Sequence, residues 1–258
     1  MKIVPIQAFN DNYIWCLGNT GSNSVVVIDP GDAAPVLSYL QRHGLGLSAI
    51  LVTHKHQDHI GGITRLTGLY PGIPVYGPRL EVVEGVTVKV GEGESIELLE
   101  IAATLEVLDV PGHTQGHVAY LDKEVLFCGD TLFAAGCGRV FSGTHAQLYA
   151  SLKKIASFLP ATRLYCAHEY TLDNLGFAAW VEPESVALKQ RIERDRASRR
   201  AGLPTVPSTL KEELATNPFL RCHIPQVIKA AEKYAGTQLL NGEAVFTALR
   251  NWKDREYD

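Results

Sequence analysis

The stretch Thr53–Gly62 reads THKHQDHIGG and places His54, His56, Asp58 and His59 within six residues. The whole chain has 9 histidines in 258 residues, so chance placement gives only about 0.2 histidines in a window of that length. Imidazole nitrogens and carboxylate oxygens suit zinc, iron or manganese, whereas thiolate-rich sets are typical of structural zinc. The stretch therefore predicts a metal site of the catalytic kind rather than a solvated polar turn.

The apolar run before this stretch predicts the strand that carries it. Residues 49–52 read AILV, which is short, β-branched and typical of a buried strand. Side chains alternate along an extended chain, so His54 and His56 would lie on one side. Asp58 and His59 follow where a helix could begin and cannot both share that side. This geometry favours two adjacent metals over one.

Composition and charge narrow the class of protein. With 46% hydrophobic and 20% charged residues, the chain can build one large domain or a domain and a half. Lys and Arg number 24 against 28 Asp and Glu, and the resulting net charge of -4 argues against nucleic-acid binding. No apolar run near the N-terminus reaches signal-peptide length, and none approaches a membrane span. We therefore expect a cytoplasmic, monomeric protein that acts on a small molecule, with no membrane partner.

The cysteines do not indicate a disulfide framework. They are odd in number and widely spaced, they lack a Cys-x-x-Cys pair, and they therefore fit a reducing cytoplasm. A Cys-His hydrolase is one alternative, because Cys128 and Cys166 each lie two residues before a strand-end Asp or His. Small buried thiols explain both positions better. The five are Cys16, Cys128, Cys137, Cys166 and Cys222.

The first 172 residues have a mixed pattern of strands and helices. Short β-rich segments are separated by Gly and Pro, and helical stretches occur at 33–43 and 145–158. This mixture predicts an α/β or α+β layered domain over residues 1–172. The predicted strands include 24–28, 49–52, 86–90, 95–101 and 105–110.

Residues 173–258 have helical periodicity and predict a small all-helical domain. Pro183 stands where a first helical turn would start, and the segment runs to Gly202. Thr209 and Glu212 have capping-box spacing, and further helices are expected at 225–236 and 242–253. A basic run from Lys189 to Arg200 is interrupted by acidic residues, so a solvated helix face is simpler than an anion-binding site.

Three further residues stand where strand-like segments end. His113 follows a Pro-Gly pair and opens the sequence HTQGH, Asp130 ends VLFCG, and His168 ends RLYCA. A two-metal centre needs roughly six to eight protein ligands. Each residue alone would more simply be a capping or core residue, but the shared context with Thr53–Gly62 makes all three candidate ligands.

Four motifs then occur in a recognisable order: THxHxDH, PGHTxGH, GDTLF and AHEYT. In order and spacing they resemble the metallo-β-lactamase superfamily over about the first 172 residues. Further segments resemble the hydroxyacylglutathione hydrolase family, also called glyoxalase II, over nearly the whole chain. These segments are NY at 12–13, FAAGCGR at 133–139, HEYTxxN at 168–174 and NPFLR at 217–221. The resemblance implies a four-layer αββα sandwich with the ligands on loops at one edge of two facing sheets.

The resemblance also implies a ligand set for two divalent metal ions. Zinc is the first expectation, and iron or manganese would be accepted by the same donors. Two cations about 3.5 to 4 Å apart can share a water and supply hydroxide at neutral pH. His54, His56 and His113 would hold one ion, Asp58, His59 and His168 the other, and Asp130 would bridge them. Asp58 would also orient the nucleophile, and His117 would support the site from behind.

The implied activity is hydrolysis of S-(2-hydroxyacyl)glutathione, such as S-D-lactoylglutathione, in the second step of methylglyoxal detoxification. The family pattern places glutathione-binding groups at Arg139, Tyr170, Arg250 and Lys253. Without the resemblance, Arg250 and Lys253 would be interpreted as a solvated helix end, although their spacing puts them on one face. Arg139 stands where lysine is common and Phe141 where tyrosine is common, which predicts weaker binding of the glutathione moiety.

Other functions remain open at this point. A lactonase or β-lactamase-like hydrolase would use the same ligands, because the metal motif alone does not select the bond. A flavodiiron protein carries Glu where His56 stands, and a persulfide dioxygenase would bind a single iron. A module that binds metal or glutathione without turnover is the alternative outside the enzymes.

Overall fold

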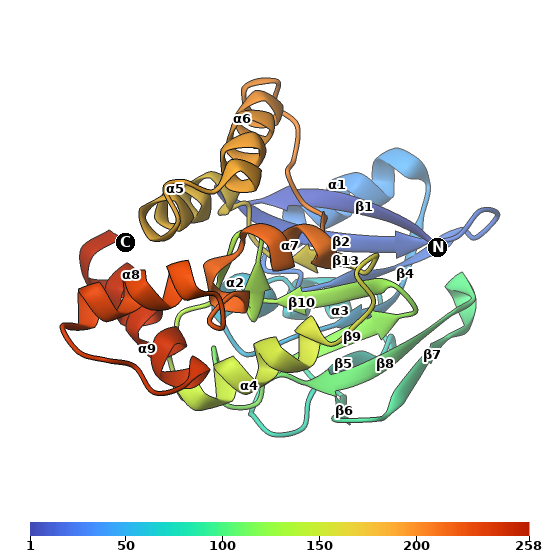
Figure 1. The fold of residues 1–258 in the computed structure, drawn as a ribbon. Coiled ribbons are helices and arrows are strands. Elements are labelled where there is room, and N and C mark those ends of the chain that lie inside the picture. Colours follow the sequence, from blue (N-terminus) through green and yellow to red (C-terminus); the bar gives the residue numbers. More distant parts are fainter. Residues whose placement is uncertain (258) are drawn as a thin grey trace. The chain divides into compact units, whose positions relative to one another are not determined.

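The computed structural model describes residues 1–257, and these residues form two compact units. The first unit comprises Met1–Val110 and Thr114–Gly129, and the second comprises Pro111–His113 and the chain from Asp130 onward. Figure 1 colours the chain along the sequence, so the first unit runs from blue into green. The expected domain boundary near residue 172 stays a prediction.

The first unit contains a six-stranded sheet in the order β1-β2-β3-β4-β5-β6 (Figure 1). Neighbours from β1 to β3 are antiparallel, and neighbours from β3 to β6 are parallel. The strands are β1 (Lys2–Ala8), β2 (Asn12–Gly18), β3 (Ser24–Ile28), β4 (Gly46–Leu51), β5 (Val75–Pro78) and β6 (Val88–Val90). Because β3, β4 and β5 are parallel, their C-terminal ends lie at the same end of the sheet. The stretch Thr53–Gly62 follows from the C-terminal end of β4.

Two helices cover one face of this sheet, α1 (Ala33–His43) and α3 (Ile63–Leu69). Alternate residues of β3 enter the apolar core that they share, as Val25 and Val27 do with Leu40 of α1 and Leu66 of α3. Helix α1 begins where Asp32 Oδ1 accepts a hydrogen bond from Ala34 N at 2.8 Å. The short helix α2 (Gln57–Ile60) carries the second half of the histidine stretch.

The first unit also contains an antiparallel run of strands in the order β10-β9-β8-β7. These are β7 (Ser95–Leu98), β8 (Ala103–Asp109), β9 (Val118–Asp122) and β10 (Val125–Gly129), with the 3-10 turn η1 (Leu99–Ile101). The buried Tyr120 of β9 donates its hydroxyl to Val52 O at 2.6 Å. This bond fixes the middle of β9 against Val52, which directly precedes the histidine stretch.

The second unit is mostly helical and is drawn from green through yellow to red in Figure 1. It also holds a small hairpin of two-residue strands and the antiparallel pair β13–β14. Its strands are β11 (Leu132–Phe133), β12 (Gly136–Cys137), β13 (Arg163–Cys166) and β14 (Ser208–Thr209). Its helices are α4 (His145–Ala156), α5 (Thr171–Val181), α6 (Val186–Arg200), α7 (Leu210–Thr216), α8 (Pro225–Ala235) and α9 (Gly242–Trp252). The short helical turns are η2 (Pro218–Leu220) and η3 (Lys253–Tyr257).

Aromatic packing joins the helices of the second unit. Phe219 of η2 stacks on Phe177 of α5 at 5.8 Å and meets Phe246 of α9 edge-on at 5.8 Å. All three rings are fully buried, so each removes a large apolar surface from water. Helix α9 also packs on α8 and α4. No helix within residues 1–257 is long and apolar enough to cross a membrane.

Several predicted elements need correction. The helix expected from Pro183 begins at Val186, because Ser185 Oγ caps it by accepting from Leu188 N at 3.3 Å. Helix α5 was not expected. The capping box at Thr209 is half formed: Thr209 Oγ1 accepts from Glu212 N at 3.3 Å, but the Glu212 carboxylate pairs with Arg194. The α/β class and the helical C-terminal region are confirmed.

The solvated face expected for the basic run of α6 is wrong for Arg191. Its side chain is 2% exposed and forms ion pairs with Glu213 and Asp195. By contrast, Arg194 is 54% exposed. The carboxylate of Glu213 comes from α7, and helical periodicity in α6 alone cannot reveal a partner on another helix.

Candidate metal centre

The first half of the candidate site follows strand β4. His54 is fully buried, and His54 Nε2 lies 3.0 Å from His56 Nδ1 with the two rings nearly perpendicular, at 78°. Two ring nitrogens that converge in this way are the arrangement that ligands of one shared cation adopt. Thr53 Oγ1 contacts His54 Nδ1 at 3.0 Å, and the ring of His117 stacks on the His54 ring at 4.7 Å. His54 is therefore fixed from two sides.

Asp58 and His59 lie at the start of α2. His59 Nε2 is 3.4 Å from Asp58 Oδ2, and His59 Nδ1 is 3.0 Å from Asp29 Oδ2. A carboxylate on the second ring nitrogen holds the imidazole so that Nε2 points to a metal, as in many metalloproteins. Asn12 Nδ2 donates to Asp58 Oδ2 at 3.0 Å and so orients that carboxylate.

Sequence reasoning missed Asp29. This buried residue has a left-handed backbone, with φ 54°, and accepts from Thr53 N at 2.7 Å and from Thr53 Oγ1 at 2.8 Å. It thus ties the end of β3 to the start of the histidine stretch. In the sequence Asp29 precedes a Pro-Gly pair, which is a turn signal, but it also directly follows the apolar segment 24–28. A carboxylate directly after an apolar strand is the signal that also indicated Asp130.

Glu81 was also missed by sequence reasoning. Its carboxylate accepts from Lys55 N at 2.8 Å and from Gly116 N at 3.1 Å. One side chain therefore joins the histidine stretch to the loop that precedes β9. No motif marks Glu81, because its role depends on two loops that are far apart in the sequence.

The second half of the candidate site comes from the second unit. Asp130 Oδ2 lies 3.5 Å from His113 Nε2 and 3.4 Å from His168 Nε2, and all three side chains are buried. One carboxylate oxygen between two imidazoles is what a bridging ligand requires. His113 Nδ1 is 2.7 Å from Arg139 O, and a proton donated there leaves the Nε2 lone pair for a metal.

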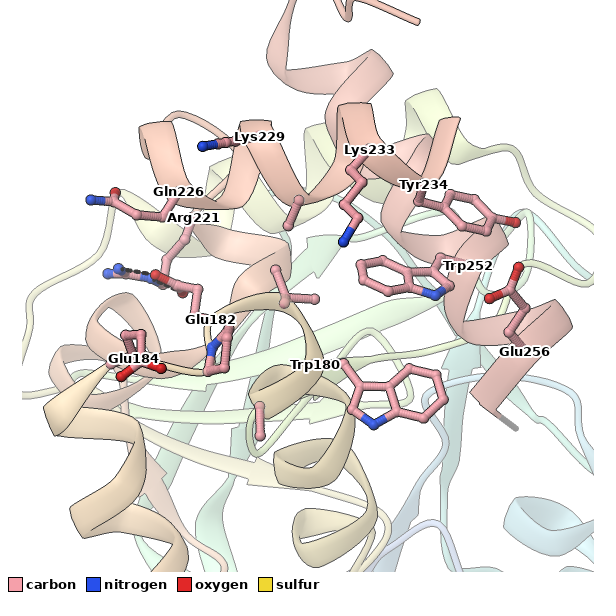
Figure 2. A pocket seen from close by; sticks show the side chains of 15 residues that line it. Trp180, Glu182, Glu184, Arg221, Gln226, Lys229, Lys233, Tyr234, Trp252 and Glu256 are labelled. Carbon is pink, nitrogen blue, oxygen red and sulfur yellow. Dashed lines mark hydrogen bonds and ion pairs between the residues drawn. The ribbon is translucent and has the colours of Figure 1, made fainter. Parts of the chain in front are cut away.

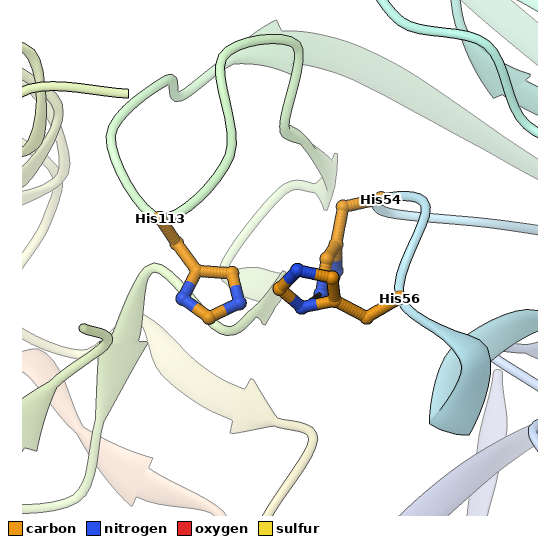
Figure 3. Close-up of side chains that lie close together, drawn as sticks. All are labelled: His54, His56 and His113. Atoms are coloured by element: carbon orange, nitrogen blue, oxygen red, sulfur yellow. Dashed lines mark hydrogen bonds between the residues drawn. The ribbon is translucent and has the colours of Figure 1, made fainter. Parts of the chain in front are cut away.

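The predicted ligands fall into groups whose ligand atoms lie within 4.8 Å of one another. One group matches the set expected for the first metal, and Figure 3 shows its three imidazoles directed toward a common point. Another group matches the set expected for the second metal. The groups are His54, His56 and His113; Asp58, His59 and His168; and His54, His59 and Asp130. A donor set of imidazole nitrogen and carboxylate oxygen fits two divalent cations such as zinc, iron or manganese.

Two of the predicted substrate-binding residues are accessible. The Tyr170 side chain is 37% exposed, and its ring stacks on the His168 ring at 4.6 Å and 6°. Arg139 is 50% exposed, and its Nε lies 3.5 Å from Asp254 Oδ1. Both can therefore reach a bound molecule beside the second half of the candidate site.

The other two predicted substrate-binding residues are buried. Arg250 is 1% exposed, donates to Cys137 O at 3.0 Å and pairs with Asp254 at 2.8 Å. Lys253 is 5% exposed and pairs with Asp173 at 3.2 Å. The solvated helix end considered from the sequence is therefore wrong. Their part in substrate binding stays a prediction.

All five cysteines are buried and free, as expected. Burial raises the pKa of the Cys137 thiol to about 11 and that of Cys166 to about 12. Burial also raises the pKa of Cys16 and Cys222 to about 12. Because a thiolate is the nucleophilic form, these thiols are unsuited to attack at neutral pH. The Cys-His hydrolase interpretation therefore loses its support at Cys166, and Cys128 is fully buried as a small core thiol.

A separate groove of about 1230 Å³ lies among the C-terminal helices. Figure 2 shows Trp180, Trp252 and Tyr234 along it, with the Lys233 ammonium group extending toward the rings. None of the residues predicted to bind metal or glutathione lines this groove.

Two sequence families match the chain. Residues 12–168 match the metallo-β-lactamase superfamily, and residues 169–256 match the family described as hydroxyacylglutathione hydrolase C-terminus. The two matched ranges meet between residues 168 and 169. The helical C-terminal part is thus matched by a family of its own.

Relatives that align with this chain over nearly their full length are described as hydroxyacylglutathione hydrolases. A hydroxyacylglutathione hydrolase of Alkalilimnicola ehrlichii is 52% identical over 98% of this chain and 99% of its own length. A hydroxyacylglutathione hydrolase of Nitrosomonas europaea is 46% identical over 98% of this chain and 96% of its own length.

Solved structures are similar in fold. ETHE1 from Myxococcus xanthus aligns with a TM-score of 0.68 at 21% identity, covering 100% of this chain and 93% of its own. TTHA1623, solved in a di-iron-bound form, aligns with a TM-score of 0.54 at 29% identity, covering 65% of this chain and 92% of its own. The metallo-β-lactamase fold expected from the motifs is confirmed.

Proposed function

This chain belongs to the hydroxyacylglutathione hydrolase family of the metallo-β-lactamase superfamily, and from that premise we propose how its residues hydrolyse a glutathione thioester. The enzyme cleaves S-(2-hydroxyacyl)glutathione, such as S-D-lactoylglutathione, to glutathione and a 2-hydroxy acid. The observation that carries this function is the 52% identity over the full length, which includes the helical half. A lactonase or β-lactamase-like activity has no comparable support.

We assign the ligands of two divalent cations in the enzyme. In this assignment His54, His56 and His113 would hold one cation, Asp58, His59 and His168 would hold the other, and Asp130 would be shared by both. The three close groups of donor atoms support this assignment. Zinc is the first candidate and iron or manganese are accepted by the same donors. When bound, the cations supply the chemistry of the reaction by lowering the pKa of a water molecule and stabilising negative charge on the thioester carbonyl oxygen.

The chain's own residues set the geometry for this reaction. Asp58, which is oriented by Asn12, accepts a hydrogen bond from the attacking water and aligns it with the carbonyl carbon. Hydrolysis forms a C–O bond and breaks the C–S bond, and the electron pair leaves on sulfur. The thiol of glutathione has a pKa of about 8.5. Its thiolate is therefore a good leaving group and departs without a strong proton donor.

Substrate binding is assigned to Tyr170, Arg139, Arg250 and Lys253. Glutathione carries two carboxylates, and a forked guanidinium is the better clamp for a carboxylate. Arg139 offers the accessible guanidinium, while the buried Arg250 supports it through the Asp254 carboxylate that both contact. Tyr170 offers a hydroxyl beside His168.

The test is an assay of purified protein with S-D-lactoylglutathione beside a β-lactam, a lactone and a phosphodiester. Metals are counted by elemental analysis. We expect thioester cleavage at two metals per chain, with little turnover of the other three substrates. Asp130→Asn should lower both the metal content and the rate. Protein that holds two metals per chain and leaves the thioester intact would contradict the proposed function.

We also place the enzyme in the cytoplasm as a monomer. The five free, buried cysteines support a reducing compartment. Light scattering on the purified protein should give a mass near that of one chain, 28.2 kDa. A mass of twice that value would contradict the monomer.

A further inference from the structure

The β11–β12 hairpin lies in the sequence between two residues that are assigned to the active site. It begins two residues after Asp130, the assigned bridging ligand, and ends two residues before Arg139, the assigned substrate guanidinium. Ala135 at its tip has a left-handed backbone, with φ 58°. Residues other than glycine adopt this conformation only where surrounding contacts hold it. The tip therefore depends on support from outside the hairpin.

Glu213 of α7 supplies part of that support. Its Oε2 accepts from Ala135 N at 2.8 Å and from Asn217 Nδ2 at 3.0 Å, and its side chain is fully buried. Its Oε1 accepts from Arg191 Nη2 at 2.6 Å. Arg191 is itself fixed by Thr216 Oγ1 at 2.6 Å. The buried carboxylate thus pairs with Arg191, which it shares with Asp195, and its other oxygen stays directed at the hairpin backbone.

Two asparagines contact the remaining backbone of the hairpin. Asn217 Nδ2 donates to Gly136 O at 2.9 Å and to Phe133 O at 3.3 Å. Asn174 Nδ2 of α5 donates to Ala134 O at 3.1 Å. Side chains from segments far along the sequence therefore hold the main chain of the hairpin at four of its polar groups.

The hairpin in turn contacts residues assigned to the site. The Phe133 ring meets the His168 ring edge-on at 5.8 Å and the Tyr170 ring at 5.3 Å. Just beyond the hairpin, Gly138 packs so closely that an added Cβ would lie 2.0 Å from Asp130 O. A shift of the hairpin therefore displaces Asp130, His168 and Tyr170 together.

We propose that Glu213 is a positioning residue of the active site, which acts through the β11–β12 hairpin with Arg191 and Asn217 as its partners. Glu213 touches neither the metal ligands nor the substrate-binding groups. It sets the hairpin conformation, and the hairpin sets where Asp130 and His168 stand. This inference rests on the proposed function and on the assigned ligands.

Glu213→Gln tests the inference with almost no change in shape. An amide has one acceptor oxygen where the carboxylate has two, so either Ala135 N–H or Arg191 loses its acceptor. Glu212→Gln is the matched control: it makes the same change one residue earlier on α7, where the carboxylate pairs with the half-exposed Arg194 and lies 3.7 Å from Arg191 Nε. It therefore changes the charge beside Arg191 without removing an acceptor from the hairpin. Readouts are kcat and KM for the thioester, zinc affinity by chelator competition, and the visible absorption spectrum of the cobalt-substituted protein.

In Glu213→Gln we expect zinc affinity to fall by about 10-fold to 100-fold, as for other residues that orient metal ligands. We also expect kcat to fall by a similar factor, KM to change far less, and the cobalt absorption bands to shift. Glu212→Gln should stay within about twofold of wild type, in keeping with a partly exposed ion pair.

Asn174→Ala removes a single uncharged contact to the hairpin and serves if Glu213→Gln fails to fold. It should change zinc affinity and the cobalt spectrum in the same direction. Variants that melt at lower temperature but keep wild-type kcat, zinc affinity and cobalt spectrum would overturn the inference, because Glu213 would then be structural only. If the wild type cleaves no thioester, the proposed function fails, whereas zinc affinity and the cobalt spectrum still test the hairpin.

Discussion

Phe141 is the residue that most directly tests how this chain binds glutathione. Its side chain is 64% exposed, and its ring meets the His113 ring edge-on at 5.2 Å. Phe141→Tyr adds a hydroxyl at the edge of the assigned substrate site. One new hydrogen bond contributes about 0.5 to 1.5 kcal/mol, so we expect KM for S-D-lactoylglutathione to fall by about twofold to tenfold with kcat unchanged. Steady-state kinetics measure both constants.

Phe9→Tyr is the matched control for Phe141→Tyr, because Phe9 is similarly exposed, at 60%, and lies in the first unit outside the assigned substrate-binding groups. It should leave KM as it is. A KM that is equal to or above the wild-type value in Phe141→Tyr would show that the hydroxyl makes no contact with the substrate.

Single residues differ in how far the sequence identifies them. His113 and Asp130 could be predicted as candidates because each follows a strand-like segment, and the structure brings them within 3.5 Å of each other. Asp29 has the same context but was hidden by the turn signal of the Pro-Gly that follows it. Arg191 was misjudged because its partner Glu213 belongs to another helix. Burial of a charge depends on its partner, and the partner is a product of the fold.

At the scale of elements, helix α2 rests directly on the loop after β3. A Cβ added at Gly31 would lie 1.8 Å from Asp58 O, which is backbone and cannot rotate away. Gly31→Ala must therefore move α2 and with it Asp58 and His59. We expect the free energy of unfolding to fall by about 1 to 3 kcal/mol, as for other overpacked sites, and metal affinity to fall as well. Urea denaturation and chelator competition measure the two effects.

Gly68→Ala is the control for Gly31→Ala. Gly68 lies within α3, and an added Cβ would meet nothing within 4 Å. Alanine is favoured over glycine in a helix by about 1 kcal/mol, so this variant should be as stable as wild type or more so. Wild-type stability and metal affinity in Gly31→Ala would mean that α2 can shift without effect on the ligands.

Elements with their own local signals could be predicted, and others could not. Helix α1 matched its expected bounds because Asp32 caps its start and Gly44 ends it with a left-handed φ of 64°. Helix α5 lacks such a signal, since Tyr170 at its start makes no side-chain cap. The β11–β12 hairpin has strands of two residues, too short for any alternation, and its conformation is set by side chains from other helices.

For the whole molecule, metal binding should raise the stability of the fold. A ligand that binds only the folded state stabilises it by about 2.7 kcal/mol when free ligand is at 100 times Kd. In a chain of this size that corresponds to a rise in Tm of roughly 5 to 10 °C. We expect a chelator to lower Tm by such an amount and added zinc to restore it, as followed by calorimetry.

Asp130→Asn should show a smaller chelator effect than wild type, because it weakens the ligand that the two cations share. A Tm that does not respond to chelator in protein shown to lose its metals would contradict the coupling between metal binding and folding.

The class of the whole molecule was within reach of the sequence. Changes in periodicity predicted a mixed α/β part and a helical part, and both exist. The sequence families meet between residues 168 and 169, whereas the compact units part between Gly129 and Asp130. Periodicity cannot show this, because compactness depends on long-range contacts such as those from Glu213 and Asn217 to the hairpin.

The hairpin contacts have a consequence for recombination between related genes. A crossover between two related genes at the family boundary would take the hairpin from one parent and Glu213, Asn217 and Asn174 from the other. These contacts reach the main chain, so they tolerate drift in the hairpin side chains but not loss of the helical partners. A chimaera that takes the hairpin and its helical partners from the same parent is therefore expected to keep the hairpin conformation, whereas one that loses a partner is not.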